Sequence, residues 1–222
     1  MALEVQWLGR RAYAPVWELQ RSLQSARITA LESGQPHPET LLLVEHEPVF
    51  TWGRRTKAGN LGQGPEALRA AGAEVFEVER GGEVTYHGPG QLVGYPIVHL
   101  GALSCRRDLH AYMRALEETL IQVLAGYGLQ GTRLPGRTGV WVGAPGAEAK
   151  VAALGVRVSK WVAMHGFALN VSNEPLPWFR LVTPCGIADR AVTSLEALLG
   201  KSPPMEDVRA RVEAAFREVM GL

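Results

Sequence analysis

The sequence predicts an α+β fold, in which helices pack on a mixed, largely antiparallel sheet. The chain contains both short apolar runs of strand length and longer segments whose apolar residues recur at helical spacing. The strands come in groups between the helices, without the regular strand–helix alternation of a doubly wound parallel sheet. A composition of 46% hydrophobic and 20% charged residues is typical of a protein with a buried core.

A helix over residues 14–31 is the first predicted element, because its apolar side chains recur at helical spacing. Gly34 and Pro36 end this pattern, since glycine favours a helix C-terminus and proline cannot continue a helix. The rest of the first half is predicted as a strand at 40–45, a glycine-rich loop at 53–64, strands at 73–79 and 92–99, and a helix at 107–127.

The second half continues in the same mixed style. Three strands are expected, at 139–142, 151–158 and 162–171, and the last two meet at a turn near Ser159 and Lys160. Thr193 and Glu196 have the spacing of a capping box for a short helix that ends at Leu199. Pro203 and Pro204 begin a last helix. We expect one domain, 1–222, with a small C-terminal lobe over about 181–222 as the alternative.

Charge and cysteine content argue against several classes of function. The 23 Lys and Arg nearly balance the 22 Asp and Glu, and a net charge of +1 predicts no extended nucleic-acid or membrane surface. Leu41–Val44, the longest dense aliphatic run, is far too short to cross a bilayer, and the N-terminus has no signal-peptide pattern. Cys105 and Cys185 form no CxxC pair and the histidines show no metal-ligand spacing, so we expect a cytoplasmic protein without a metal site.

The stretch Arg80–Gln91 reads Arg-Gly-Gly-Glu-Val-Thr-Tyr-His-Gly-Pro-Gly-Gln and is the most unusual in the chain. Its glycines let backbone amides approach a ligand, and Arg80, Thr85, Tyr86 and His87 supply hydrogen-bond donors around it. The alternative is a tight turn between two strands. The stretch is neither a P-loop nor a GxGxxG motif, so nucleotide binding gains little support.

Cys185 stands between a proline and a glycine in Thr-Pro-Cys-Gly-Ile, which describes a sharply turned and exposed backbone. A thiolate is a strong nucleophile when it is accessible and near a positive charge. Cys105 is a rival on physical grounds, because Arg106 and Arg107 follow it at the start of a predicted helix. An inert core residue is the ordinary alternative for either cysteine.

Lys150 and His165 are two further polar residues in apolar surroundings. Lys150 enters an apolar run after a Gly/Ala/Pro turn, so it is either a snorkelling edge residue or a partly desolvated amine. His165 lies within a predicted apolar strand, where its ring needs a polar partner, and a satisfied core histidine is the simpler interpretation.

Five ordered blocks of the chain together resemble a known family. They are Leu43–Thr51 (Leu-Val-Glu-His-Glu-Pro-Val-Phe-Thr), Arg80–Tyr95, Lys150–Val158 (Lys-Val-Ala-Ala-Leu-Gly-Val-Arg-Val), His165–Asn170 (His-Gly-Phe-Ala-Leu-Asn) and Thr183–Gly186 (Thr-Pro-Cys-Gly). In this order they resemble the octanoyl-[acyl-carrier-protein]:protein octanoyltransferases of lipoate biosynthesis, also called lipoyl(octanoyl) transferases. The resemblance spans most of the chain and implies a catalytic domain of the biotin/lipoate protein ligase type, a mixed sheet with flanking helices.

The resemblance also implies roles for individual residues. Cys185 matches the family's nucleophile, and Lys150 matches the lysine that keeps this thiol ionised and helps to move protons. The segments that match the acyl-substrate lining are Arg80, Gly81, Gly82, Glu83, Val84, Thr85, Tyr86 and His87, then Ala153, Leu154 and Gly155, then Gly166, Phe167 and Ala168. His165 is expected to support the site, and Cys105 matches no block.

The implied reaction transfers an octanoyl group from acyl-carrier protein to a lysine of another protein through a Cys185 thioester. The implied acceptors are the lipoyl domains of 2-oxoacid dehydrogenase complexes and the glycine-cleavage H protein. We expect a monomer that needs no cofactor, because a carrier thioester is already activated. The alternatives are an ATP-dependent lipoate or biotin ligase on the same fold and a non-catalytic acyl-carrier binding module.

Four further expectations concern the transfer and its partners. Backbone N–H groups of the glycine-rich stretch are expected to stabilise the oxyanion, and Lys150 or His165 to receive the proton of the acceptor amine. The residues expected to form an apolar slot for the acyl chain are Leu154, Phe167, Ala168 and Leu169. The residues expected to meet an acidic carrier protein are Arg54, Arg55 and Lys57.

Overall fold

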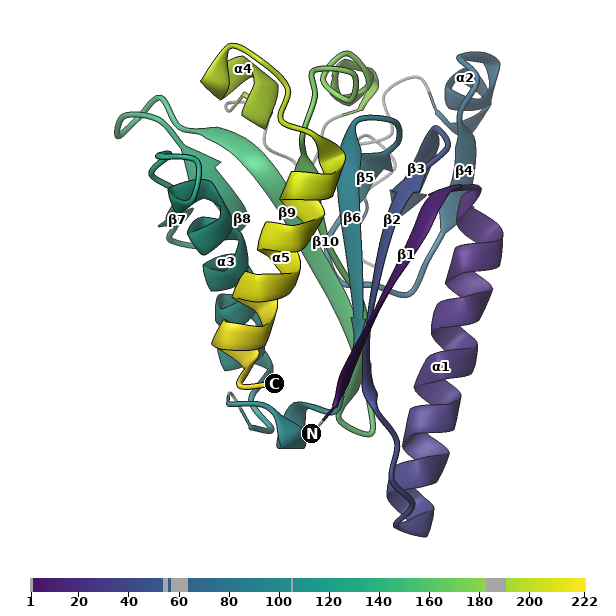
Figure 1. The fold of residues 1–222 in the computed structure, drawn as a ribbon. Coiled ribbons are helices and arrows are strands. Elements are labelled where there is room, and N and C mark those ends of the chain that lie inside the picture. The colour runs from purple at the N-terminus through teal and green to yellow at the C-terminus, as the bar shows by residue number, and fades with distance from the viewer. Residues whose placement is uncertain (1, 54–55, 57–63, 105, 183–190) are drawn as a thin grey trace.

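Two β-sheets organise the chain (Figure 1). The computed structural model describes residues 2–53, 56, 64–104, 106–182 and 191–222. The large sheet has the order β1-β2-β6-β10-β9-β8-β7 and the small sheet the order β4-β3-β5. The strands are β1 Leu3–Arg11, β2 Glu39–His46, β3 Val49–Trp52, β4 Glu74–Glu77, β5 Val84–His87, β6 Gln91–Ile97, β7 Thr132–Leu134, β8 Arg137–Val142, β9 Ala149–Ser159 and β10 Val162–Asn170.

The large sheet is mixed, as the sequence predicts. β1 pairs with β2 in parallel, whereas β2, β6, β10, β9, β8 and β7 pair in antiparallel fashion. The helices are α1 Tyr13–Ser33, α2 Pro65–Ala70, α3 Leu109–Ala125, α4 Leu195–Leu199 and α5 Met205–Met220, with 3-10 turns at Leu100–Ala102 and Trp178–Leu181. The expected α+β class is therefore confirmed.

Helices cover both faces of the large sheet (Figure 1). On one face α3 and α5 pack over Leu41 and Leu43 of β2, in the largest hydrophobic core. On the other face α1 packs over Leu42 and Val44 of the same strand. Because successive strand residues point to opposite faces, an unbroken apolar run such as this marks a strand buried on both sides.

The helix α1 begins and ends close to the predicted boundaries. Gly34 adopts a left-handed conformation with φ 68°, and its N–H bonds to the carbonyls of Ala30 and Leu31 at the helix end. The buried face of α1 is unusually polar. Arg27 pairs with Glu39 at 2.6 Å, and both side chains are almost fully buried. This pair ties α1 to the start of β2.

The expected pair of strands after Lys150 forms a long hairpin. The pairing of β9 with β10 begins where Ser159 faces Val162 and continues to the point where Ala152 faces Leu169. In the turn between the strands, Lys160 and Trp161 have positive φ. All residues of β10 are buried, at the centre of the sheet between β6 and β9. The predicted turn position is confirmed.

Some elements differ from the sequence-based expectation. β1, β3, β7 and the short α2 were not predicted, and residues 84–87 of the stretch Arg80–Gln91 form β5, paired with β3. The capping box at Thr193 was wrong, because Ser194 Oγ accepts the hydrogen bond of Ala197 N at 3.0 Å. Thr193 instead pairs through its N–H with the carbonyl of Lys150.

The last helix packs into the main core rather than beside it. Val208, Val212, Phe216 and Met220 of α5 lie with α3 in the core of the large sheet. In the part of the chain that the structure describes, no helix is both long and apolar enough to span a bilayer.

Candidate active site

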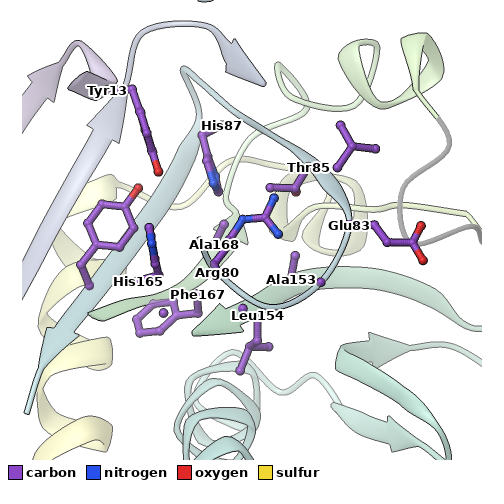
Figure 2. Close-up of a pocket in the computed structure, with 15 residues that line it drawn as sticks. Tyr13, Arg80, Glu83, Thr85, His87, Ala153, Leu154, His165, Phe167 and Ala168 are labelled. Atoms are coloured by element: carbon purple, nitrogen blue, oxygen red, sulfur yellow. The ribbon is translucent and has the colours of Figure 1, made fainter. Parts of the chain in front are cut away.

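A narrow cavity of about 50 Å³ lies where the small sheet meets α1, β6, β9 and β10 (Figure 2). Its walls are Tyr13, Arg80, Gly82, Glu83, Val84, Thr85, His87, Tyr95, Ala153, Leu154, Gly155, His165, Gly166, Phe167 and Ala168. Three separate stretches of chain that the sequence analysis singled out thus meet at one place. The central position of β10 and the long reach of β9 bring them together.

All the expected acyl-lining residues except Gly81 and Tyr86 line this cavity. Tyr86 points to the side of β5 opposite Thr85 and His87, where its ring stacks on Trp178 with centroids 5.0 Å apart. Gly81 lies along β9, and its N–H donates to the carbonyl of Val156 at 3.0 Å. This N–H is therefore already paired, and an oxyanion donor must be sought elsewhere in the stretch.

Of the expected apolar slot, Leu154, Phe167 and Ala168 line the cavity. Leu169 does not line it and lies further along β10 in the main hydrophobic core. The Phe167 ring lies against the backbone of Gly94 on β6, where a Cβ would come 2.2 Å from Phe167 Cζ. Glycine at this position is what allows the ring to occupy its place.

A buried guanidinium forms the polar wall of the cavity. Arg80 is 7% exposed, and its Nη2 donates to the carbonyl and the hydroxyl of Thr51 at 2.8 and 3.0 Å. Its Nη1 also bonds to the carbonyl of Gly81 at 3.1 Å. The chain passes closely here, since a Cβ on Gly53 would lie 2.6 Å from the Gly82 carbonyl. Arg80 is thus a positive charge held in one orientation.

Three histidines with depressed basicity gather around this wall. Burial, followed by the charge of His46, lowers the pKa of His87 to about 3. Burial and the charge of Arg80 lower the pKa of His165 to about 3. Burial also lowers the pKa of His46 to about 4, and its ring lies 6.1 Å from that of His87. All three imidazoles are therefore neutral at physiological pH.

A hydrogen-bonded relay decides which nitrogen of His87 carries the hydrogen. Asn170 Nδ2 donates to the carbonyl of Thr193 at 2.9 Å, so its Oδ1 accepts from Gln91 Nε2 at 2.8 Å. Gln91 Oε1 then accepts from His87 Nδ1 at 2.8 Å. Because a carbonyl can only accept, the direction of every bond follows, and His87 Nε2 is the nitrogen without a hydrogen, which can act as an acceptor.

A backbone carbonyl also fixes the tautomer of His46. Its Nδ1 lies 3.0 Å from the carbonyl of Arg11 and must donate to it. Its Nε2 therefore accepts the hydroxyl hydrogen of Tyr95, at 2.9 Å. Burial raises the pKa of Tyr95 well above its usual value, so this hydroxyl stays protonated.

His165 has an unusual backbone and an unsatisfied ring nitrogen. Its φ is 58°, and its N–H donates to Gln20 Oε1 of α1 at 3.0 Å. Among the described residues, the buried Nε2 has no hydrogen-bond partner. A non-glycine residue held at positive φ with a buried, unsatisfied polar atom is typical of functional sites.

Lys150 does not line the narrow cavity. Its side chain is 9% exposed, and its Nζ lies 4.7 Å from the ring centroid of Trp141, its neighbour across β8 and β9. The Lys150 backbone bonds on the other side to Ala191 and Thr193, at 2.8 and 2.9 Å. Lys150 lines a second, larger cavity that adjoins the first.

Four expected contributors lie outside the described residues, namely Cys185, Arg54, Arg55 and Lys57. The described chain resumes at Ala191, the residue that bonds to the Lys150 backbone. Five residues at or near the cavity were not predicted from the sequence: Tyr13, His46, Tyr95, Gln91 and Asn170. The last four stand inside or at the end of the blocks quoted above, and their polar side chains within those blocks were the available signal.

A family model described as "Lipoyl protein ligase A/B catalytic domain" matches residues 12–217. The chain belongs to this family. It is 52% identical over 223 residues to an octanoyltransferase of Rubrobacter xylanophilus, with 99% of this chain and 95% of the relative covered. It is 45% identical to an octanoyltransferase of Thermobifida fusca, covering 97% and 88% of the two chains. The expected resemblance and the expected acyltransferase class are confirmed.

Solved structures of the lipoyl ligase type share the fold. A bipartite lipoate protein ligase of Thermoplasma acidophilum aligns with TM-score 0.72 at 16% identity, over 99% of this chain and 84% of that one. A biotin protein ligase of Aquifex aeolicus aligns with TM-score 0.54 at 16% identity, over 99% and 69%. The expected architecture is confirmed, and identities this low show the fold alone.

Proposed function

We propose that this member of the family moves an octanoyl group from acyl-carrier protein to Cys185 and then to a lysine of a lipoyl domain. The observation that best supports this proposal is the cavity itself. Leu154, Phe167 and Ala168 give it apolar walls, and β9, the strand that carries Leu154, presents Lys150 nearby.

The cavity suits an unbranched apolar chain better than a bulky or charged ligand. It is narrow, and entry of an eight-carbon chain requires side chains such as the half-buried Leu154 to move. Burial of seven methylene or methyl groups contributes roughly 5 kcal/mol before any cost of that movement. Such a contribution is large enough to favour one chain length over another.

The proton balance of the two half-reactions rests on Lys150. In the first, the Cys185 thiolate attacks the carrier thioester, and the ammonium of Lys150 gives its proton to the departing carrier thiolate. In the second, the acceptor amine attacks the Cys185 thioester, and the now neutral Lys150 takes its proton. His165 is a poor alternative base, since burial lowers its pKa to about 3.

Both the carrier and the acceptor are proteins in this proposal. The T. acidophilum ligase that shares the fold was solved as a lipoylation system with its E2 lipoyl domain. We propose the same class of acceptor here, including lipoyl domains of 2-oxoacid dehydrogenase complexes and the H protein. A monomer in a reducing cytosol, which keeps the thiol available, suits this chemistry.

Intact-mass spectrometry tests the proposal directly. Mixing the protein with octanoyl-carrier protein should add one octanoyl group, and subsequent addition of an apo lipoyl domain should move that group to the domain. Cys185→Ser should abolish the first step, whereas Cys105→Ser should not. Transfer at the normal rate by Cys185→Ser, or pyrophosphate release from ATP and free octanoate by the unmodified protein, would refute it.

A further inference from the structure

A second cavity of about 760 Å³ adjoins the narrow one, on the side of α3. Its walls are Gly81, Gly82, Glu83, Leu109, His110, Met113, Arg114, Glu117, Gly136, Arg137, Thr138, Lys150, Leu154, Gly155 and Val156. We call it the α3 groove. Four of its residues also line the narrow cavity, namely Gly82, Glu83, Leu154 and Gly155. The two spaces therefore meet at this part of β9 and the glycine-rich stretch.

The order of residues along these walls orients a substrate. Phe167 and Ala168 line only the narrow cavity, whereas Lys150 lines only the α3 groove. With the acyl chain in the narrow cavity and the reacting carbonyl near Lys150, whatever is bonded to that carbonyl extends into the α3 groove.

The walls of the α3 groove combine apolar surface with charged groups, of which three are cations and two, Glu83 and Glu117, are carboxylates. Leu109 is 43% exposed, and with Met113 and Val156 it supplies apolar surface. Arg114 and Arg137 line the opposite parts of the groove, on α3 and at the start of β8. This mixture fits an elongated ligand that has methylenes and amides along its length and an anionic group at its far end.

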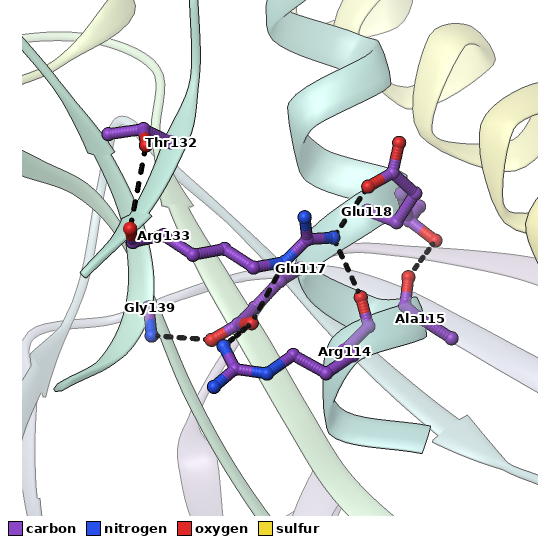
Figure 3. A network of polar contacts seen from close by, with 8 residues as sticks. Arg114, Ala115, Glu117, Glu118, Thr132, Arg133 and Gly139 are labelled. Carbon is purple, nitrogen blue, oxygen red and sulfur yellow. Dashed lines mark hydrogen bonds and ion pairs between the residues drawn. The ribbon is translucent and has the colours of Figure 1, made fainter. Parts of the chain in front are cut away.

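A buried carboxylate holds the two arginine-bearing elements together (Figure 3). Glu117 is 1% exposed, accepts from Gly139 N at 3.1 Å and pairs with Arg114 and Arg133 at 2.6 and 3.2 Å. Arg133, on β7, also pairs with Glu118 of α3 at 2.5 Å. These bonds attach the hairpin of β7 and β8 to α3 and thereby hold two walls of the groove together. The two arginines also compensate the buried negative charge of Glu117.

We propose that the α3 groove binds the thiol-side arm of the acyl donor, a phosphopantetheine-type chain with two amides and a terminal phosphate. The proposal rests on the function proposed above and adds the place and the chemistry of donor recognition. An acceptor lysine fits the groove less well, because its cationic amine would meet Arg114, Arg137 and Lys150 against only Glu83 and Glu117, and because its four methylenes need little of the volume.

Two octanoyl donors of different length separate this idea from a general effect on catalysis. Octanoyl-4′-phosphopantetheine has the complete arm, whereas octanoyl-N-acetylcysteamine keeps only the thioester and the nearest amide. The quantity measured is kcat/KM for acylation of Cys185 without acceptor, followed by intact mass. Met113→Trp should obstruct the groove and lower this value about tenfold for the long donor, with little change for the short one.

A charge variant tests the far end of the arm. Arg137→Ala should lower kcat/KM about fivefold for the phosphorylated donor. It should leave kcat/KM unchanged for octanoyl-pantetheine, which lacks the phosphate. Ala125→Trp, at the exposed end of α3, and Arg211→Ala, on the exposed side of α5, are the matched controls and should behave like the unmodified protein. If Met113→Trp does not fold, Arg137→Ala decides the question.

If the groove variants lose kcat/KM equally for long and short donors, or for neither, the proposal about the groove is overturned while the acyltransferase function stands. A loss confined to transfer from Cys185 to the lipoyl domain would also overturn it, since the groove would then admit the acceptor. If the unmodified protein is acylated by none of the donors, the proposed function itself fails and the inference fails with it.

Discussion

Gln91 Oε1 accepts a hydrogen bond from His87 Nδ1 at 2.8 Å, in a relay that ends at the carbonyl of Thr193. The N–H of Thr193 in turn bonds to the carbonyl of Lys150. One continuous set of hydrogen bonds thus connects a ring in the wall of the narrow cavity with the strand that presents the proposed catalytic lysine. It sets the tautomer of the ring and the position of β9 together.

Removal of the acceptor in this relay should release the His87 tautomer. We expect Gln91→Met to lower kcat by roughly tenfold to a hundredfold, with a smaller change in KM, because the Nε2 lone pair is no longer held in one place. Nitrogen-15 NMR of the imidazole should show a mixture of tautomers. Gln130→Met, at an exposed position, serves as the control. A single unchanged tautomer in Gln91→Met would contradict the role of the relay.

The three buried histidines should make the protein less stable in acid. Their pKa values in the folded state are lowered, to about 4 for His46 and about 3 for His87 and His165, from an ordinary 6.5. Between these values the unfolded chain binds more protons than the folded one, so stability is lost as the pH falls below about 6.5. Each histidine contributes a slope approaching about 1.4 kcal/mol per pH unit.

Urea unfolding at pH 7, 5.5 and 4.5 measures this slope. His46→Gln should reduce the loss of unfolding free energy between pH 7 and 4.5. His110→Gln, which changes an exposed histidine, should not reduce it. Unfolding free energies that stay level over this range, or that respond equally to both substitutions, would show that the buried rings do not determine the acid sensitivity.

Trp141 should position the ammonium of Lys150. The Nζ lies 4.7 Å from the centroid of the indole ring, and a cation over an aromatic face is favoured by about 0.5–2 kcal/mol. We expect Trp141→Leu to slow alkylation of Cys185 at pH 7 about fivefold, with partial recovery in Trp141→Phe. Trp161→Leu, at the exposed hairpin turn, is the control. Identical pH profiles of alkylation in Trp141→Leu and the unmodified protein would reject this role.

Gly94 should influence which acyl chains the cavity accepts. A Cβ here would lie 2.2 Å from Phe167 Cζ, so Gly94→Ala must displace that ring. We expect a loss of roughly 1–3 kcal/mol of stability, as for other overpacked positions. The relative rates with four- to ten-carbon donors should also change, since Phe167 lines the cavity. If a folded Gly94→Ala protein shows the same relative rates with these donors as the unmodified protein, the acyl chain does not bind beside Phe167.

Much of the candidate site could be predicted because its residues come in unbroken blocks. The glycines of residues 80–91 indicate a backbone that approaches its neighbours closely, and the structure shows this at Gly53 and Gly82. Tyr13 could not be found in this way, because it comes singly from α1 and only the packing of that helix against the small sheet brings it to the cavity. His46 stands within the block Leu43–Thr51, but only the fold places its ring 5.3 Å from that of Tyr13.

The sequence by itself determined the α+β class and the β9–β10 hairpin, because apolar periodicity and glycine placement depend on neighbouring residues. The resemblance of its five blocks to a known family indicated the segments that form the cavity. Only the tertiary structure decided that Tyr86 and Leu169 lie outside the cavity lining, that three histidines stay uncharged, and that Lys150 lines the α3 groove. Burial and the side to which a strand residue points depend on which distant strands become neighbours, and short-range sequence patterns contain little of that information.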